Sequence, residues 1–149
     1  MMKFSVFILL SAGIAISNCS APQPVTDAQA IEQLRNFYVY YLTESGQIGK
    51  EHYRGVDSLL AKYSTVKLTE QLKAQDEAGY DFIANTNGHQ IEAAKTVKVL
   101  KDENEKDIYI VSFSYLRPPP EPDEVNTLRL RLIKTPSGIL IDEIVSSSP

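Results

Sequence analysis

The sequence predicts an α+β domain in which N-terminal helices, one long and two short, pack on a curved antiparallel sheet of about four strands. Two patterns support this prediction. Before Gly88, apolar residues recur every three or four positions, which is the period of an amphipathic helix. After Gly88, apolar and polar residues alternate, as in a strand with one buried face. Helices followed by a run of strands are the order expected of an α+β domain.

The first expected helix is the longest and covers Ala28–Thr43. Asp27 is the expected N-cap, with Thr26 as its rival, and the helix should end near Ser45 and Gly46. Its apolar residues are spaced by three and four, so they share one face. They are Ile31, Leu34, Phe37, Tyr38, Tyr41 and Leu42.

Two shorter helices are expected to follow a loop. The segment Gln47–Gly55 is polar, contains two glycines and is typical of that loop. The helices are expected over Ser58–Tyr63 and Val66–Ala78, with Asp57 and Thr65 as their N-caps.

Four strands are expected after a turn at Asn85–Gly88. In order, they cover Gln90–Leu100, Asp107–Leu116, Val125–Ile133 and Ile139–Val145. The connections are short, including a charged turn at Lys101–Lys106 and a turn at Thr135–Gly138, so a meander is the simplest topology. The connection Arg117–Asp123 is rich in proline, which cannot donate to a central ladder.

Composition narrows the class of protein. The chain has 149 residues, of which 43% are hydrophobic and 23% are charged, as in an ordinary globular domain. Its net charge of −4 argues against a general nucleic-acid binder, because phosphate contacts need clustered Lys and Arg. One Cys excludes an internal disulfide and a Cys-rich zinc site, and we expect neither metal nor cofactor.

Residues 1–18 are expected to be a lipoprotein signal peptide. Lys3 is followed by Phe4–Ile16, an uncharged run too short for a membrane span and typical of a signal peptide. The motif Ile16-Ser17-Asn18-Cys19 resembles the bacterial lipobox, in which the thiol receives a diacylglyceryl group and cleavage occurs just before it. Asn18 departs from that motif, where Gly or Ala is usual.

This resemblance implies that Cys19 is lipidated, that residues 19–26 are a tether and that residues 27–149 are the single domain. Several acyl chains on one Cys anchor a protein stably. In enterobacterial lipoproteins, a residue other than Asp after the Cys favours the outer membrane, and here it is Ser20. The alternative is an ordinary secretory cleavage that leaves Cys19 as a free thiol.

Residues from about 30 to 145 are similar to the small bacterial lipoproteins grouped as domain of unknown function 3828. The resemblance rests on the aromatic run Phe37–Leu42, on Tyr80–Ile83 and on the closing strand Gly138–Ile144. Phe82 stands where that family has Pro, and Ile139 or Leu140 stands where it has Trp. The family implies a nuclear-transport-factor-2-like or cystatin-like fold and offers no catalytic residues. Related domains include immunity proteins that inhibit secreted peptidoglycan amidases.

Four residues are candidate ligand or partner contacts. In folds of this type a pocket lies between the long helix and the concave sheet, and Tyr40 would line it; the alternative is a tyrosine that only packs on the sheet. Arg129 and Arg131 share the sheet face opposite the leucines, where they could grip a carboxylate or phosphate. Alternatively, that face is solvated and its charge is balanced by Glu92 or other nearby acids. Asp81 could pair with a His or satisfy the turn after it.

The run Pro118, Pro119 and Pro120 is the most unusual feature of the sequence. Consecutive prolines favour the extended polyproline II form, which partner grooves bind at low entropic cost. The neighbouring acids Glu121, Asp123 and Glu124 would suit a basic partner. The alternative is a rigid loop that prevents edge pairing.

No catalytic constellation is evident. His52 and His89 lie in polar stretches without metal-binding spacing, and neither a nucleophile elbow nor a phosphate loop is present. We therefore expect a non-catalytic domain, lipid-anchored at the periplasmic face of the outer membrane, that binds another envelope component, most simply a protein. The alternatives are a small-ligand-binding domain or enzyme with a helix–sheet pocket, and an immunity-type inhibitor of a secreted cell-wall enzyme.

Overall fold

The computed structural model describes residues 23–46, 50–75, 80–85, 91–117 and 119–148. Within these residues lie three α-helices, a short 3₁₀ helix and four strands, and the α+β fold that the sequence predicts is confirmed. The helices are α1 (Asp27–Ser45), α2 (Lys50–Tyr63) and α3 (Val66–Gln75), and the 3₁₀ helix covers Ile91–Thr96. The strands are β1 (Lys98–Lys101), β2 (Ile108–Tyr115), β3 (Glu124–Thr135) and β4 (Gly138–Ser148).

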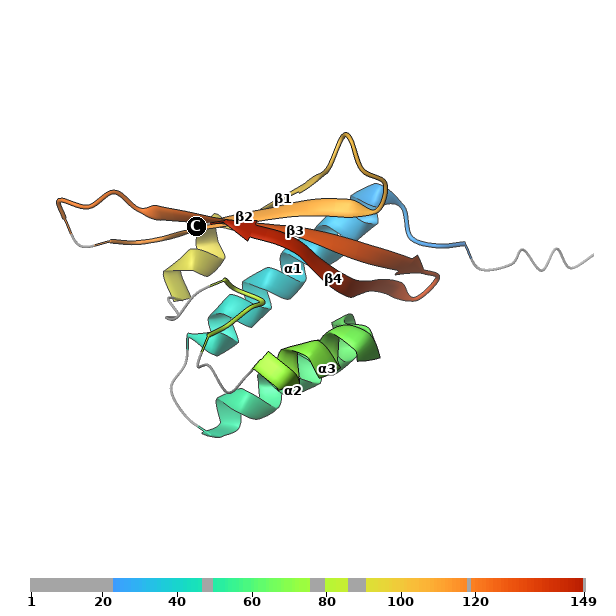
Figure 1. The fold of residues 1–149 in the computed structure, drawn as a ribbon, viewed down its shortest axis with the longest axis horizontal. Coiled ribbons are helices and arrows are strands. Elements are labelled where there is room, and N and C mark those ends of the chain that lie inside the picture. The colour runs from blue at the N-terminus through green and yellow to red at the C-terminus, as the bar shows by residue number, and fades with distance from the viewer. Residues whose placement is uncertain (1–22, 47–49, 76–79, 86–90, 118, 149) are drawn as a thin grey trace, which may run out of the picture.

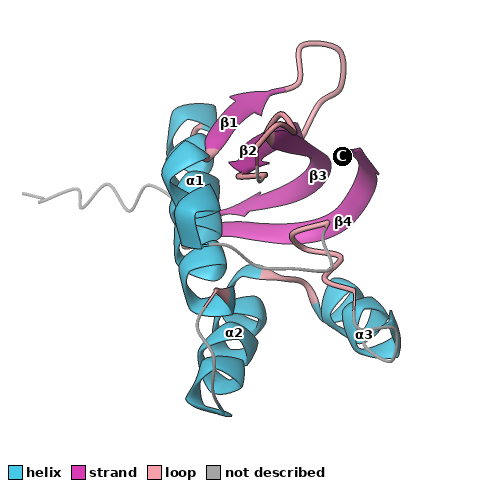
Figure 2. Cartoon of the chain, turned by 90° about the vertical axis from the view of Figure 1, so that its left-hand side faces the viewer, coloured by secondary structure: helices cyan, strands magenta, loops and turns pink. Residues whose placement is uncertain are grey.

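The strands form one antiparallel sheet in the order β1-β2-β3-β4, which is the expected meander. Figure 1 shows α1 lying across one face of this sheet, with α2 and α3 beside it near β4. Seen along the strands, the sheet is curved (Figure 2). Two register shifts between β3 and β4, at Arg129/Leu130 and Arg131/Leu132, contribute to the curvature, because a bulge bends its strand. None of the described helices lies over the other face of the sheet in either view.

The core lies between α1 and the inner face of the sheet. Leu34, Phe37 and Tyr38 of α1 are each at most 1% exposed. The alternation in β3 is as predicted, because its three leucines all point inward. The buried side chains of the inner face of the sheet are Val99, Tyr109, Val111, Phe113, Tyr115, Asn126, Leu128, Leu130, Leu132, Ile139 and Ile141.

The start of α1 corrects the expected N-cap. Thr26, the rival candidate, is the cap, and it forms a capping box with Gln29. Asp27 is instead the first residue of the helix, and its carboxylate reaches across to the sheet. It accepts hydrogen bonds from Lys101 Nζ at 2.6 Å, Lys134 Nζ at 2.7 Å and the Tyr109 hydroxyl at 2.7 Å. These contacts fasten the start of α1 to β1, β2 and β3.

Replacing Asp27 by Asn is expected to lower the free energy of unfolding at pH 7 by about 1–2 kcal/mol. The hydrogen bonds from Lys101, Lys134 and Tyr109 hold the pKa of this carboxyl well below its usual range. Because this pKa is lower in the folded state, the ionised carboxylate stabilises the fold fully at pH values above its unfolded-state pKa of about 4. That contribution declines below pH ~4 and is lost as the pH falls through the folded-state pKa. Urea unfolding at a series of pH values should show the two proteins converging below pH ~4. Asp57→Asn, at an exposed position, is the control. If the difference in free energy of unfolding between wild type and Asp27→Asn did not change with pH, this role of Asp27 would be contradicted.

Helix α2 begins earlier than expected. The sequence predicts a loop over residues 47–55 and an N-cap at Asp57, but α2 starts at Lys50 and runs through both Gly55 and Asp57. Gly55 marks a close approach of two helices and not a loop, because a Cβ there would lie 3.1 Å from Oε2 of Glu44 on α1. The expected cap of α3 is confirmed, since Thr65 Oγ1 accepts a hydrogen bond from the Leu68 N–H.

The first expected strand is largely wrong. Residues 91–96 form the 3₁₀ helix, and only Lys98–Lys101 pairs as β1. Ala93 and Ala94 are adjacent and both buried, which a strand with one buried face cannot achieve. Thr96 Oγ1 donates to the Ala93 carbonyl and accepts from the Ser114 N–H, and so it joins the 3₁₀ helix to β2.

The three later strands lie where expected, and β3 and β4 are longer than predicted. The turn before β4 is also as expected; Gly138 adopts a φ of +146°, which other residues rarely tolerate. The predicted turn at Asn85–Gly88 lies mostly outside the described residues, although Asn85 itself has a φ of +52°.

Candidate functional site

The outer face of the sheet, opposite α1, gathers most of the residues that the sequence singled out. Alternation places Val125, Arg129, Arg131 and Ile133 of β3 on this face. Leu100 of β1 lies in the same row as Arg129, since both pair through Ile110. The large hydrophobic residues exposed on this face or directly beyond it are Leu100 (65%), Leu116 (52%), Val125 (52%) and Ile133 (45%).

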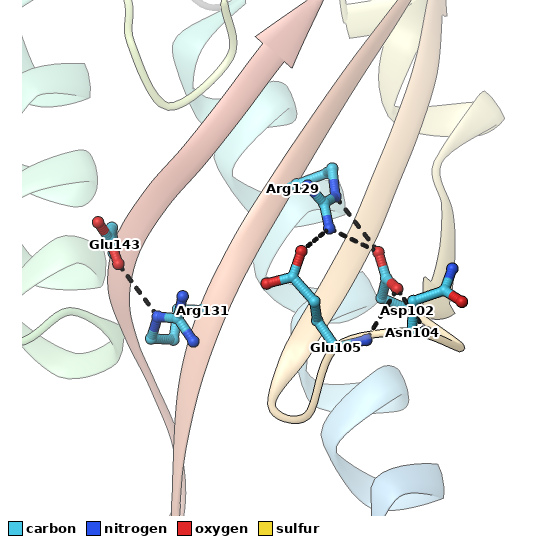
Figure 3. Close-up of polar contacts among 6 residues, drawn as sticks. All are labelled: Asp102, Asn104, Glu105, Arg129, Arg131 and Glu143. Carbon is cyan, nitrogen blue, oxygen red and sulfur yellow. Dashed lines mark hydrogen bonds and ion pairs between the residues drawn. The ribbon is translucent and has the colours of Figure 1, made fainter.

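Arg129 is held by acids of the β1–β2 turn. Its guanidinium donates to Asp102 Oδ2 at 2.9 and 3.3 Å and to Glu105 Oε1 at 2.6 Å (Figure 3). Asp102 also accepts the N–H groups of Asn104 and Glu105. The Asn104 N–H, followed by Arg129, lowers the pKa of Asp102, and Glu105 and Asp102 raise the pKa of Arg129. This pairing stiffens the turn and leaves Arg129 little capacity for a ligand.

Arg131 pairs with one neighbour on the next strand. Its Nε lies 3.0 Å from Oε2 of Glu143, and both side chains are partly exposed (Figure 3). The structure therefore places the two arginines on one face, as predicted, but each is already paired with acidic side chains of this chain. Glu92, which the sequence offered as a balancing charge, pairs with Lys95 instead.

The Pro-rich connection forms a hairpin that projects beyond the sheet at the far end from the start of α1 (Figure 1). Pro119 and Pro120 lie in a turn, not in the expected extended form, and Pro118 lies outside the described residues. Arg117 pairs with Glu121 and Glu124, and its backbone N–H donates to Asp123. Two carboxylates thus pair with the guanidinium and a third with the backbone, so the hairpin keeps an excess of negative charge.

Asp81 holds its own turn. Its carboxylate accepts the Ala84 N–H and the Tyr41 hydroxyl, both at 2.9 Å. Burial and the nearby carboxylate raise the pKa of Tyr41 well above its usual value, so the hydroxyl stays a donor. His89 lies outside the described residues, as does Cys19, whereas His52 lies in α2 and not in a loop.

Tyr40 is not where the sequence analysis placed it. It is 48% exposed and turned away from the sheet, where it lines an open groove of about 610 Å³ between α1 and α2. The described space between α1 and the sheet is filled by core side chains such as Tyr38, Phe113 and Leu128. The expected helix–sheet pocket at Tyr40 is therefore wrong.

Sequence reasoning missed two parts of these surfaces. Leu100 could have been placed beside Arg129, because alternation and hairpin pairing were both predicted. The groove could not, because it depends on how α1 and α2 pack against each other, which no local pattern in the sequence records. In the described ranges, His, Cys, Asp and Glu side chains form no group of three that could hold a metal ion. No helix in the described part of the chain is long and apolar enough to cross a bilayer.

Comparison with known proteins supports the fold of this chain and gives no information about its function. No family model matches the chain, and no curated protein matches it. A crystal structure of a protein of unknown function from Bacteroides thetaiotaomicron is similar, with a TM-score of 0.70 and 22% identity. The similarity covers 83% of this chain and 91% of that one. The similarity to domain of unknown function 3828 stays a prediction.

Proposed function

We propose that the chain is a lipid-anchored, non-catalytic domain at the periplasmic face of the outer membrane and that it binds an envelope protein through the outer face of its sheet. The observation that carries this proposal is that four large aliphatic side chains are exposed on that face or directly beyond it. Leu100, Leu116, Val125 and Ile133 are each at least 45% exposed. A solvated sheet face ordinarily carries polar residues, so aliphatic residues exposed there favour a protein contact. Leu116 and Val125 lie near each other, because Val125 pairs with Ser114.

Charge indicates the chemistry of the partner. The β1–β2 turn sets Asp102 and Glu105 around Arg129, and the β2–β3 hairpin sets three acids around Arg117. Both turns therefore border the apolar residues with net negative charge. A complementary partner has an apolar patch with a basic rim.

The place of the hairpin agrees with an anchor at Cys19. Asp27, where α1 begins after the expected tether, contacts Lys101 and Lys134 at one end of the sheet. The β2–β3 hairpin projects from the other end (Figure 1). A lipid at Cys19 would thus leave the hairpin pointing away from the membrane. The same projection favours the second candidate, an immunity-type inhibitor whose loop enters the active site of a cell-wall enzyme.

Photo-crosslinking in a Gram-negative host tests the proposal. A photoreactive residue is placed at Leu100, at Val125 or, as a matched control, at Val66, which is 75% exposed on α3. The chain is expressed with its own leader. We expect the first two positions to give an adduct of the same mass and Val66 to give none. Equal adducts at all three positions, or no adduct at either position on the sheet, would contradict a docking face.

The same cells test the anchor. The wild-type chain should gain the mass of its acyl groups and fractionate with outer membrane, whereas Cys19→Ala should be soluble and should lose most of the adduct. A soluble wild type without lipid would mean that Asn18 blocks processing. The proposed anchor would then be wrong, while the crosslinking result would still test the proposed docking face independently.

A further inference from the structure

The groove between α1 and α2 is independent of the sheet face. Its wall on α1 is Tyr40 with Asn36, and its wall on α2 includes Ser58 and Lys62. Phe37 forms the base, where its ring lies 5.5 Å from that of Tyr63. The volume of about 610 Å³ is in the range of small-molecule sites.

Three polar groups in the groove have no partner within the described part of the chain. They are the Asn36 amide, the Tyr40 hydroxyl and the Ser58 hydroxyl, none of which makes a hydrogen bond there. Water can satisfy them, but they are also the groups that a polyhydroxylated ligand would bond. An amide and two hydroxyls can each donate and accept, which suits the mixed character of sugar hydroxyls.

Lys62 gives this end of the groove a positive charge. Its ammonium lies 5.0 Å from the centroid of the Tyr63 ring, and it is the charged side chain that lines the groove. Glu44 approaches α2 at Gly55, seven residues before Lys62 and therefore about 10 Å away along the helix axis. A ligand with a carboxylate near Lys62 would be attracted without facing Glu44.

The exposed Tyr40 ring supplies a flat surface beside these groups. The face of an aromatic ring is negative, so it attracts the weakly positive C–H groups on the face of a pyranose. A helical peptide would instead require a continuous apolar groove, whereas Asn36, Ser58 and Lys62 interrupt the apolar lining here. We propose that this groove binds a sugar acid, with the ring on Tyr40, hydroxyls on Asn36 and Ser58, and the carboxylate on Lys62.

The experiment is a titration of the full chain in detergent micelles, followed by ligand-observed NMR. Glucuronate is the probe, glucose is the same ring without the carboxylate, and benzoate is a carboxylate without the hydroxyls. We expect glucuronate to bind about fivefold more tightly than glucose, as one exposed ion pair allows, and more tightly than benzoate. Lys62→Gln should abolish the preference over glucose, and Tyr40→Ala should weaken both sugars.

Lys73→Gln, an exposed lysine in the last turn of α3, is the control and should change nothing. The proposal is overturned if no probe binds, if benzoate matches glucuronate, or if Lys62→Gln keeps the preference for glucuronate. The last two results would leave an aromatic site or a different sugar site.

Discussion

Replacing Tyr38 by Ala is expected to lower the free energy of unfolding by about 3–5 kcal/mol, the range for removing a large buried ring. Tyr38 is fully buried, and its ring packs at 5.2 Å from Phe37 and 5.8 Å from Phe113. Its hydroxyl also donates to the Ile83 carbonyl at 3.0 Å. The variant therefore loses the contacts that join α1 to β2 and to the segment before the sheet. Urea unfolding monitored by circular dichroism measures the loss.

Tyr40→Ala is the matched control, because it removes the same side chain from the same helix. Tyr40 is 48% exposed, so its loss should cost at most about 1 kcal/mol. Tyr38→Phe separates the ring from the hydroxyl and should cost about 1–2 kcal/mol. Similar losses for Tyr38→Ala and Tyr40→Ala would mean that α1 does not pack on the sheet as described.

The different positions of Tyr38 and Tyr40 could be predicted from the sequence. Two residues apart on an α-helix are about 200° apart around its axis, so the two side chains point to nearly opposite sides. Tyr38 follows the spacing of Leu34 and Leu42 and was correctly placed in the core. Tyr40 falls outside that spacing, so the pocket expected beside it, between α1 and the sheet, is wrong.

Other parts of the fold depend on contacts that no local pattern records. Gly55 looks like a loop residue, yet it lies within α2, at a point where Glu44 of α1 passes close by. The 3₁₀ helix resembles a strand in sequence, and Ala93 and Ala94 show otherwise only through their burial against the rest of the molecule. The strands from β2 onward were predictable, because their alternation extends over eight or more residues.

The candidate surfaces were likewise predictable where they depend on a local pattern and not where they depend on contacts between distant segments. Alternation alone placed Arg129 and Arg131 on the outer face. Their partners depend on where the β1–β2 turn folds and on the register of β4, and Glu92 was the wrong choice for that reason. A bulge between Arg131 and Leu132 sets Arg131 opposite Glu143, and the position of such a bulge cannot be predicted from the sequence.

Asn126 is a buried amide on the inner face of β3, where the neighbouring inward-facing residue is a leucine. It is 1% exposed, and its Nδ2 donates to the carbonyls of Ala84 and Asn85 at 3.5 and 3.3 Å. This side chain ties the segment before the sheet to β3, while its Oδ1 makes no hydrogen bond. An alternation pattern predicts an apolar residue here, so an amide in its place indicates a specific polar contact.

Asn126→Asp is expected to cost about 3–5 kcal/mol at pH 7, because it buries an unpaired charge against two carbonyl oxygens. Burial raises the pKa of the new carboxyl, and its protonated form can donate to one carbonyl again. The penalty should therefore shrink as the pH falls towards the unfolded-state value of about 4 and grow above it. Asn126→Ala should cost only about 1–3 kcal/mol, independently of pH. The exposed Asn104→Asp is the control, and an Asn126→Asp loss no larger than that of Asn126→Ala would show that this position is open to water.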